Sequence, residues 1–316
     1  TYPMANRAHG NKTSITEFIL LGFQTLPELQ FFLFLLFLVT YIVTVAGNLL
    51  ILALVVADHN LHTPMYFFLG NLSCLETCYS SIILPKMLAG LLTGVQSISF
   101  SGCLTQYYFF GSLVGTECFL LSVMSYDRYL AICHPLRYTA LMRGRDWLRL
   151  AGGSWIGGFL GNGIATFSLS LLTFCGPNTI DHFLCDLDPL IRLSCNDSQM
   201  METLVFIFIL IFSLVPFLLT VTSYICIIAT ILRIPSTRGR QKAFSTCSSH
   251  LIVVTIYYGT LLIVYMFPTT DLLGDFQKVV SIIYTVLTPL VNPLIYSLRN
   301  KEVKDALRKV IWFHVI

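Results

Sequence analysis

The sequence predicts an all-α membrane protein: a bundle of seven transmembrane helices followed by a short amphipathic helix on the cytosolic side. Three observations predict this fold class. Of the 316 residues, 55% are hydrophobic and only 11% are charged. Several stretches contain the ~20 mostly apolar residues that a helix needs to cross a bilayer. Most of the 19 Lys and Arg residues fall on one side of the membrane that these stretches define.

We expect a single domain over residues 1–316, with an extracellular tail at 1–27, the bundle at 28–298 and a cytosolic tail at 299–316. The formal net charge of +3 is too small to suggest a nucleic-acid partner. In the N-terminal tail, Asn11 opens an Asn-Lys-Thr sequon. We expect it to carry a glycan if the tail lies outside the cell.

The first two spans are predicted at about residues 29–56 and 64–86, and each contains a polar side chain. A lone asparagine in lipid needs a partner on another helix, so we expect Asn48 to face the bundle. Glu76 is the first of two acids inside the predicted membrane region. The third span, at about residues 102–133, contains the second acid, Glu117.

The third span closes with Met124–Tyr138, which reads MSYDRYLAICHPLRY. Asp127 and Arg128 sit at a membrane boundary, where charges are costly unless they have partners, and their adjacency supplies one. Pro135 then ends the helix, because a proline disfavours the helical conformation of the residue before it. An ordinary interfacial ion pair with a helix stop is the simpler alternative, but the order of all fifteen residues favours a specific role.

The fourth, fifth and seventh spans are predicted at about residues 148–172, 200–232 and 278–298, and the sixth ends at about residue 267. The fourth span is rich in glycine, which lets helix backbones approach closely. The polar segment at 175–199 contains three cysteines and follows this span. Beyond residue 300, apolar residues recur at helical spacing among Lys and Arg residues, which is typical of a helix lying on membrane lipids: Val303, Leu307, Val310 and Ile311.

The basic residues also predict the orientation of the chain. Five of the 19 lie on the N-terminal side of the membrane: Arg7, Lys12, Lys86, Arg192 and Lys278. The N-terminus is therefore expected outside and the C-terminus in the cytosol. This orientation places four cysteines in the oxidising compartment, where disulfides form: Cys103, Cys175, Cys185 and Cys195. Four cysteines allow three pairings, and the sequence alone does not choose among them.

Four stretches in this order resemble the odorant receptors, a family of rhodopsin-like G-protein-coupled receptors. They are PMYFFLGNLS, MSYDRYLAICHPLRY, KAFSTCSSHL and PLVNPLIYSLRN, which begin at Pro64, Met124, Lys242 and Pro289. The resemblance covers essentially the whole chain. It implies a receptor in the plasma membrane, in the cilia of olfactory sensory neurons. It also implies coupling through a heterotrimeric stimulatory (olfactory) G protein that raises cAMP.

The resemblance further implies the disulfide pairs Cys103–Cys185 and Cys175–Cys195. Seven residues take roles in activation and G-protein coupling by the same resemblance: Asp127, Arg128, Tyr129, Tyr224, Asn292, Pro293 and Tyr296. Two positions depart from the usual patterns. Glu76 stands where rhodopsin-like receptors usually have Asp. Tyr257 stands where odorant receptors usually have Phe, and Tyr258 takes the position of the toggle aromatic.

Glu76 and Glu117 form a candidate cation site, which is the only cofactor that we expect. In rhodopsin-like receptors the acid of the second helix takes part in a sodium site. Two carboxylates in one apolar interior do not both ionise at low cost, so one binds a proton or a cation lies between them. Two separately hydrogen-bonded carboxyl groups are an equally simple alternative.

Ligand pockets in helix bundles are mostly apolar with a few polar groups. The outer halves of four predicted helices supply thirteen candidates for such a pocket: Phe110, Gly111, Val114, Gly115, Phe208, Ile209, Phe212, Tyr258, Leu261, Leu262, Tyr265, Ile282 and Thr285. Core packing is the alternative for each one. Because no acid or base stands among these positions, we expect a small, neutral odorant as the ligand.

Three other functions fit the sequence less well. A rhodopsin-like receptor for a non-odorant ligand is the nearest alternative. A secondary transporter is less favoured, because the two halves of the chain show no repeat with broken helices at matching positions. We expect no enzymatic activity, since the seven histidines are scattered and Ser248-Ser249-His250 lies in a basic flank rather than beside a buried acid.

Overall fold

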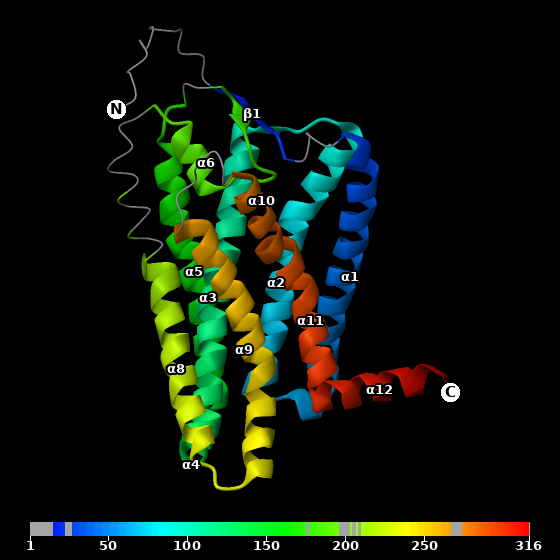
Figure 1. Cartoon of the computed structure of the whole chain (residues 1–316), viewed down its shortest axis with the longest axis vertical. Helices are drawn as coiled ribbons and strands as arrows, with labels where there is room; N and C mark the ends of the chain where they lie inside the picture. Colours follow the sequence, from blue (N-terminus) through cyan, green and yellow to red (C-terminus); the bar gives the residue numbers. More distant parts are fainter. Residues whose placement is uncertain are drawn as a thin grey trace.

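In the computed structural model, long helices lie side by side in one bundle (Figure 1). The structure describes residues 15–22, 27–174, 177–195, 203, 207, 210–266 and 274–315. Asn11, Cys175, Phe208 and Ile209, which were singled out in the sequence, lie outside these residues.

The first three long helices are α1 (Gln30–Ala57), α2 (Pro64–Thr93) and α3 (Phe100–Cys133). The short turn η1 (Pro27–Leu29) precedes α1, and η2 (His59–Leu61) lies between α1 and α2. Pro64 begins α2, where its missing N–H costs nothing. Ser99 caps α3 by accepting a hydrogen bond from the Gly102 backbone N–H at 3.1 Å. His134 follows the last residue of α3, as the proline after it predicts.

Two helices follow α3: the short α4 (Pro135–Leu141) and the long α5 (Gly144–Ser170). Beyond the outer loop, α8 (Val215–Leu232) and α9 (Thr237–Met266) run antiparallel. The last membrane helix is built from α10 (Gly274–Ile282), the π-helical η4 (Ile283–Leu287) and α11 (Thr288–Arg299). The chain ends in α12 (Lys301–Val315), which turns sideways from the foot of α11 (Figure 1).

Two wide helical turns each end two residues before a proline. The π-helical η3 (Leu210–Leu214) precedes Pro216, and η4 precedes Pro289. A proline inside a helix donates no hydrogen bond and its ring clashes with the carbonyl four residues earlier. Those carbonyls belong to Phe212 and Thr285, within the two wide turns. The wider turns therefore give each proline ring the space that an α-helix lacks.

Six helices in the described part of the chain are long and apolar enough to cross a membrane: Gln30–Ala57, Pro64–Thr93, Phe100–Cys133, Leu210–Leu232, Cys247–Val264 and Lys278–Tyr296. The remaining predicted span is α5, which has 27 residues and packs against α3 in the same bundle. Its many glycines and the charged residues at its start make it less apolar. Together these helices form the predicted bundle of seven.

Apolar side chains cover the outside of the bundle as well as its core. On α1, Phe31 and Val56 are each 70% exposed. Such a surface suits contact with lipid rather than water. Polar groups turn inward instead: Asn48 is fully buried, as predicted, and donates to the Pro289 carbonyl at 3.1 Å. Trp155 Nε1 donates to the Asn71 side-chain oxygen at 3.1 Å. These bonds tie α1 to α11 and α5 to α2.

A small sheet covers the outer end of α3, which the sequence analysis did not predict. Its strands lie in the order β2 (Ser97–Ser99), β1 (Glu17–Leu20) and β3 (Thr179–Ile180). β1 pairs antiparallel with β2, with Phe18 opposite Ile98, and parallel with β3. Phe18 is fully buried and packs edge-on against Phe174. Residues of the N-terminal tail thus form part of an outer lid with its own apolar core.

At the opposite end of the bundle, α12 is held against the loop between α1 and α2. Lys309 Nζ lies 3.0 Å from Asp58 Oδ2, and the Tyr66 hydroxyl donates to Asn300 Oδ1 at 2.8 Å. Val303 and Ala306 are buried against the bundle. The amphipathic pattern read from the tail therefore forms a helix that is anchored by its apolar face and by one ion pair.

The contact between α3 and α5 yields a prediction for Gly158→Ala. A Cβ at residue 158 would lie 2.6 Å from the Ser112 carbonyl oxygen and 2.7 Å from the Thr116 backbone nitrogen. Because both atoms are backbone, the helices must separate, and we expect a loss of about 1–3 kcal/mol of stability. The thermal midpoint of the purified protein and its surface level in cells measure this loss.

Gly152→Ala, on the same helix, is the matched control, since no atom lies within 4 Å of its Cβ position. We expect its thermal midpoint to stay unchanged or rise. Equal midpoints for the two variants would contradict close packing of α3 on α5.

Candidate ligand cavity and activation site

A cavity of about 90 Å³ lies among α3, α5, η3 and α9, under the outer lid. Its wall includes six of the thirteen positions proposed from the sequence: Phe110, Gly111, Val114, Gly115, Phe212 and Leu261. Four of these recur on one face of α3, as their helical spacing predicts. The cavity is therefore lined mainly by apolar groups from helices far apart in the chain.

Six further wall residues were not proposed from the sequence: Tyr107, Cys118, Asn162, Asp186, Leu187 and Ser213. Tyr107 and Cys118 continue the face of α3 that carries Phe110, Val114 and Gly115, so helical spacing could have identified them. Asn162 and Asp186 come from the fourth helix and the outer loop, which the sequence analysis left out of the pocket. The predicted bridge between Cys103 and Cys185 was the one signal that placed Asp186 near α3.

The Cys103–Cys185 disulfide holds the lid over the cavity. Its sulfur atoms are 2.03 Å apart, and both cysteines are fully buried. Gln106, one turn further along α3, accepts a hydrogen bond from the Cys185 backbone N–H at 3.0 Å. This is the pairing that the family resemblance implied. Cys195 is also disulfide-bonded, while its predicted partner Cys175 lies outside the described residues.

Asp186 follows the bridge directly and is only 6% exposed. Its Oδ1 accepts from the Leu187 backbone N–H at 2.7 Å and so caps α6 (Leu187–Arg192). The sequence-based reason for a neutral ligand was that no acid stood among the pocket positions. The cavity wall also contains an acid outside those positions, because Asp186 follows the disulfide.

Asn162 crosses from α5 to α3 and shapes the side of the cavity. Its Nδ2 donates to the carbonyls of Tyr107 and Tyr108, at 3.2 and 2.8 Å. A Cβ on residue 111 would lie 2.7 Å from the same nitrogen, so a larger residue there would force the Asn162 side chain to move. Gly111 and Asn162 therefore fit each other as a pair.

Four proposed pocket residues do not reach the cavity wall: Tyr258, Leu262, Ile282 and Thr285. Tyr258 lies just beneath, buried, with its hydroxyl donating to the Cys118 carbonyl at 2.8 Å. Thr285 donates to the Ser281 carbonyl of its own helix at 2.6 Å. The side chain of Tyr265 is outside the described part. Tyr258 thus links the cavity wall on α3 to α9.

A polar cluster lies at the centre of the bundle. Glu76 and Glu117 are almost fully buried, and Asn292 donates a hydrogen bond to Glu76 Oε1. Among the described residues, Glu117 Oε1 and Asn48 Oδ1 have no hydrogen-bond partner. No group of three or more His, Cys, Asp or Glu residues there is placed to hold a metal ion. The cluster thus leaves two buried oxygens that a proton, a water or a monovalent cation would satisfy.

The end of α3 away from the lid contains the predicted ion pair. Arg128 Nη2 lies 2.6 Å from Asp127 Oδ2, with Asp127 almost fully buried. Tyr138 on α4 donates to the other carboxylate oxygen at 2.8 Å. Burial and the charge of Asp127 raise the pKa of Tyr138, so that its hydroxyl stays protonated and able to donate. Arg128 is therefore held by Asp127, and Asp127 is held by both Arg128 and Tyr138.

The other predicted activation residues make contacts of their own. Tyr224 bonds to His250 Nδ1 at 2.6 Å, which joins α8 to α9. The Tyr129 hydroxyl bonds to His134 at 2.9 Å. Pro293 packs against Gly47, where a Cβ would lie 3.3 Å from its ring. Within the described residues, the buried Tyr296 hydroxyl has no hydrogen-bond partner. Tyr224 is thus bonded to a histidine, and not to Arg128, in this arrangement.

The chain matches the olfactory receptor family model over residues 37–313, which is most of its length. It belongs to the olfactory receptor family. It is 49% identical to olfactory receptor 5AP2 of Mus musculus over 306 residues, covering 97% of this chain and 96% of that protein. It is 50% identical to human olfactory receptor 11L1, covering 95% and 94% of the two chains. For human olfactory receptor 11H4 the identity is 51%, with 94% and 92% covered.

Membership of the olfactory receptor family confirms three expectations from the sequence. The fold is a transmembrane helix bundle of a multi-pass membrane protein. The resemblance read from the four stretches is confirmed by full-length relatives. The family is a class of receptors rather than enzymes, as expected from the absence of a catalytic constellation in the sequence.

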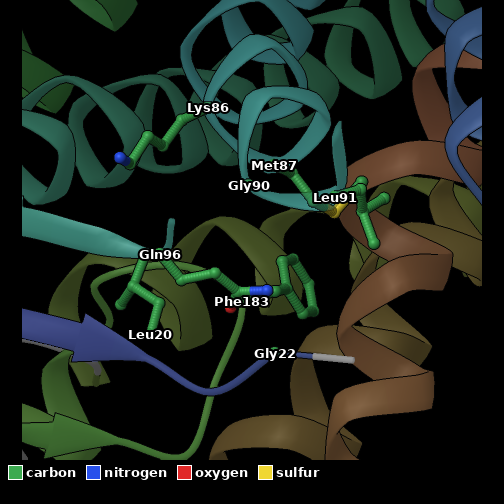
Figure 2. A pocket seen from close by; sticks show the side chains of 8 residues that line it. All are labelled: Leu20, Gly22, Lys86, Met87, Gly90, Leu91, Gln96 and Phe183. Carbon is green, nitrogen blue, oxygen red and sulfur yellow. The ribbon is translucent and has the colours of Figure 1, made fainter. Parts of the chain in front are cut away.

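A second, smaller cavity in this olfactory receptor lies at the outer end of α2 (Figure 2). It has a volume of about 20 Å³, and Phe183 and Leu91 line it together with Gln96. Lys86 also lines it and donates a hydrogen bond to the Ser97 carbonyl at 2.7 Å. A space of this size holds about one water molecule. It is therefore a packing gap in the lid rather than a second ligand site.

The lid is also joined to α10 by an ion pair between Lys278 and Asp181, at 2.6 Å. The next residue, His182, is buried, stacks on Phe183, and accepts from the Leu184 backbone N–H at 3.3 Å. Burial, and next the charge of Lys278, lowers the pKa of His182 to about 4, although Asp181 opposes this shift. The histidine is therefore neutral in the folded lid at neutral pH.

This environment predicts an acid-sensitive lid. In the unfolded chain His182 binds a proton below about pH 6.5, whereas in the folded lid it binds one only near pH 4. The unfolded state therefore binds more protons between these values, and stability falls as the pH drops from about 6.5 towards 4. We expect the thermal midpoint of the purified receptor to fall over this range.

In His182→Gln we expect a smaller decrease over the same range, because glutamine does not titrate. The difference between the two proteins, rather than the total decrease, tests the assignment. An identical decrease in both would show that His182 is not the titrating group.

Proposed function

We propose that this protein is an odorant receptor: it binds a small, mostly apolar volatile in the cavity beneath the lid and activates a stimulatory G protein, which raises cAMP. The observation that carries this proposal is the pairing of two sites within one member of the olfactory receptor family. One is an apolar cavity at the outer end of α3, and the other is the Asp127–Arg128 ion pair at its cytosolic end.

The chain is proposed to lie in the plasma membrane with its N-terminus outside, in the cilia of olfactory sensory neurons. The excess of Lys and Arg at the end of the bundle that carries α4 and α12 supports this orientation. In this orientation the cavity opens towards the odorant and the Asp127–Arg128 pair faces the G protein. The proposed glycan on Asn11 would also lie outside.

The proposed mechanism is a shift of population between two arrangements of the bundle. A ligand that binds one arrangement more tightly favours it in proportion to that difference. Cys118 lines the cavity and its carbonyl holds the Tyr258 hydroxyl, so a ligand that displaces α3 or α9 strains this bond. Further along α9, His250 holds Tyr224. A movement of α9 would therefore release Tyr224 near Arg128, and the arginine would leave Asp127 for the G protein.

The apolar part of the cavity wall favours a ligand with an apolar skeleton. Whether the ligand is neutral, as expected from the sequence, depends on what Asp186 binds. A rhodopsin-like receptor for a non-odorant small ligand is the alternative, and a panel of volatiles separates it from an odorant receptor.

The coupling role predicts the outcome of Arg128→Ala. Cells that express the full chain with the olfactory G protein are exposed to a broad panel of volatiles while cAMP is measured. We expect the unmodified receptor to respond to at least one volatile and Arg128→Ala to lose the response at equal surface level.

Arg192→Ala is the matched control, because Arg192 is an exposed arginine on the outer lid, paired with Asp188. It removes the same side chain and should leave the response intact. Full signalling from Arg128→Ala would exclude this arginine from the mechanism.

We also propose that Glu76 and Glu117 share a proton or a sodium ion. Oxygen donors suit a monovalent cation, and the unsatisfied Glu117 oxygen is available to one. These two acids would hold the ion. Its positive charge would let both carboxyl groups stay ionised, and the shared ion would link α2 to α3. Such a link resists rearrangement of the helices.

If sodium binds, replacing sodium with choline in receptor-containing membranes should increase the potency of an activating volatile by a few fold. Glu117→Gln should abolish this sodium dependence while retaining the response. The same sodium dependence in the variant and in the unmodified receptor would place the ion elsewhere.

A further inference from the structure

The side-chain amide of Asn162 is held between α5 and α3 in one orientation. Its Nδ2 donates to the backbone carbonyls of Tyr107, at 3.2 Å, and Tyr108, at 2.8 Å. These two bonds occupy both hydrogens of the amide nitrogen, and a carbonyl oxygen only accepts. Turning the amide over would lose both bonds and place Oδ1 against two carbonyl oxygens. The partners therefore decide which amide atom is the nitrogen and which is the oxygen.

The oxygen of this amide is left for the cavity. Asn162 lines the cavity wall and is 3% exposed. Its nitrogen faces the backbone of α3, and within the described part of the chain no group donates a hydrogen bond to Oδ1. A buried acceptor that has no donor is costly. A water molecule can remove that cost, but a ligand that displaces the water has to supply the donor itself.

Gly111 sets the depth of the amide in the wall. A Cβ at residue 111 would lie 2.7 Å from Asn162 Nδ2 and 2.8 Å from Oδ1. The amide thus lies against the backbone of α3, in the space where a side chain of residue 111 would stand. The oxygen is presented to the cavity by a short side chain that is packed on one side and hydrogen-bonded at its nitrogen.

We propose that Asn162 determines ligand specificity by accepting a hydrogen bond from the ligand, so that the receptor selects volatile alcohols over ketones of the same skeleton. This inference rests on the proposed function and names the ligand class within it. Apolar surface from Phe110, Val114 and Leu261 packs against the carbon skeleton. The Asn162 oxygen accepts from the ligand hydroxyl, whereas a ketone would bring a second acceptor against it and leave both oxygens unpaired.

The experiment uses matched sets of a secondary alcohol, its ketone and the fluoride that replaces the hydroxyl, on a skeleton that is active in the volatile panel. The three compounds are close in size, so differences in potency report the hydroxyl rather than the shape. Concentration–response curves for cAMP are measured in cells that express the full receptor. We expect the alcohol to be ~2- to 10-fold more potent than the ketone or the fluoride, as for one hydrogen bond between neutral groups.

Asn162→Ala removes the acceptor, and we expect the ratio of alcohol to ketone potency to fall to near one. The substitution also removes two bonds between α5 and α3, which can lower the surface level. The double variant Gly111→Ala with Asn162→Ala keeps the test possible, because the methyl group at residue 111 occupies space that the amide vacates. Its ratio should also be near one.

Gly111→Ala alone keeps the amide but displaces it, because the new methyl group takes the position of the amide atoms. We expect its ratio to fall below that of the unmodified receptor. Gly163→Ala is the matched control on α5, next to Asn162 and outside the described cavity wall. Its Cβ would lie 3.7 Å from Tyr108 Cε2, an ordinary contact. Its ratio should equal that of the unmodified receptor.

A purely structural role of Asn162 would shift the potencies of the three compounds in parallel, or abolish all three responses. A preference set by Asp186 in the same wall would persist in both variants that lack the amide. Either result, or an unmodified receptor that responds equally to all three compounds, overturns the inference while the odorant-receptor function stands. Silence of the unmodified receptor towards every volatile, at confirmed surface level, overturns the proposed function and this inference together.

Discussion

The arrangement of this bundle depends on one constraint: a polar group inside an apolar environment must find its partner on another segment of the protein. Asn48 on α1 reaches the Pro289 carbonyl of the last membrane helix, and Asn162 on α5 reaches the backbone of α3. Tyr258 on α9 does the same at Cys118. Because each bond joins two helices, the polar residues define which helices are neighbours, while the apolar residues supply the packing.

The third helix receives most of these connections and extends from the lid to the opposite end of the bundle. Its outer end is bonded to the loop through Cys103, its middle carries the cavity wall and Glu117, and its inner end carries the Asp127–Arg128 pair. Glycines on α5 and α3 bring these two helices into close contact. A change at the cavity therefore acts on a helix that is rigidly packed along one side. The opposite side, towards α9, is joined by hydrogen bonds that can exchange partners.

Sequence reasoning located the site where the information was local. The spacing of Phe110, Val114 and Leu261 placed them on the inner faces of their helices, and all three reach the cavity. The same reasoning placed Thr285 and Ile282 in the pocket, but they do not reach its wall. Helical spacing gives the face of a helix but not its depth or tilt against its neighbours. The π-helical turn before Pro289 changes the register of this segment, and spacing based on an α-helix does not include such a turn.

The sequence by itself determined the fold class, the spans, the candidate ion pair and the family, because hydropathy, charge position and motif order are properties of the linear chain. Only the tertiary structure decided that Asp186 and Asn162 belong to the cavity and that the tail strand β1 belongs to the lid. Those placements depend on contacts between residues far apart in the chain: a disulfide, a sheet of three separate segments and a close helix crossing. Local periodicity has no information about such contacts, and here they decide the chemistry of the site.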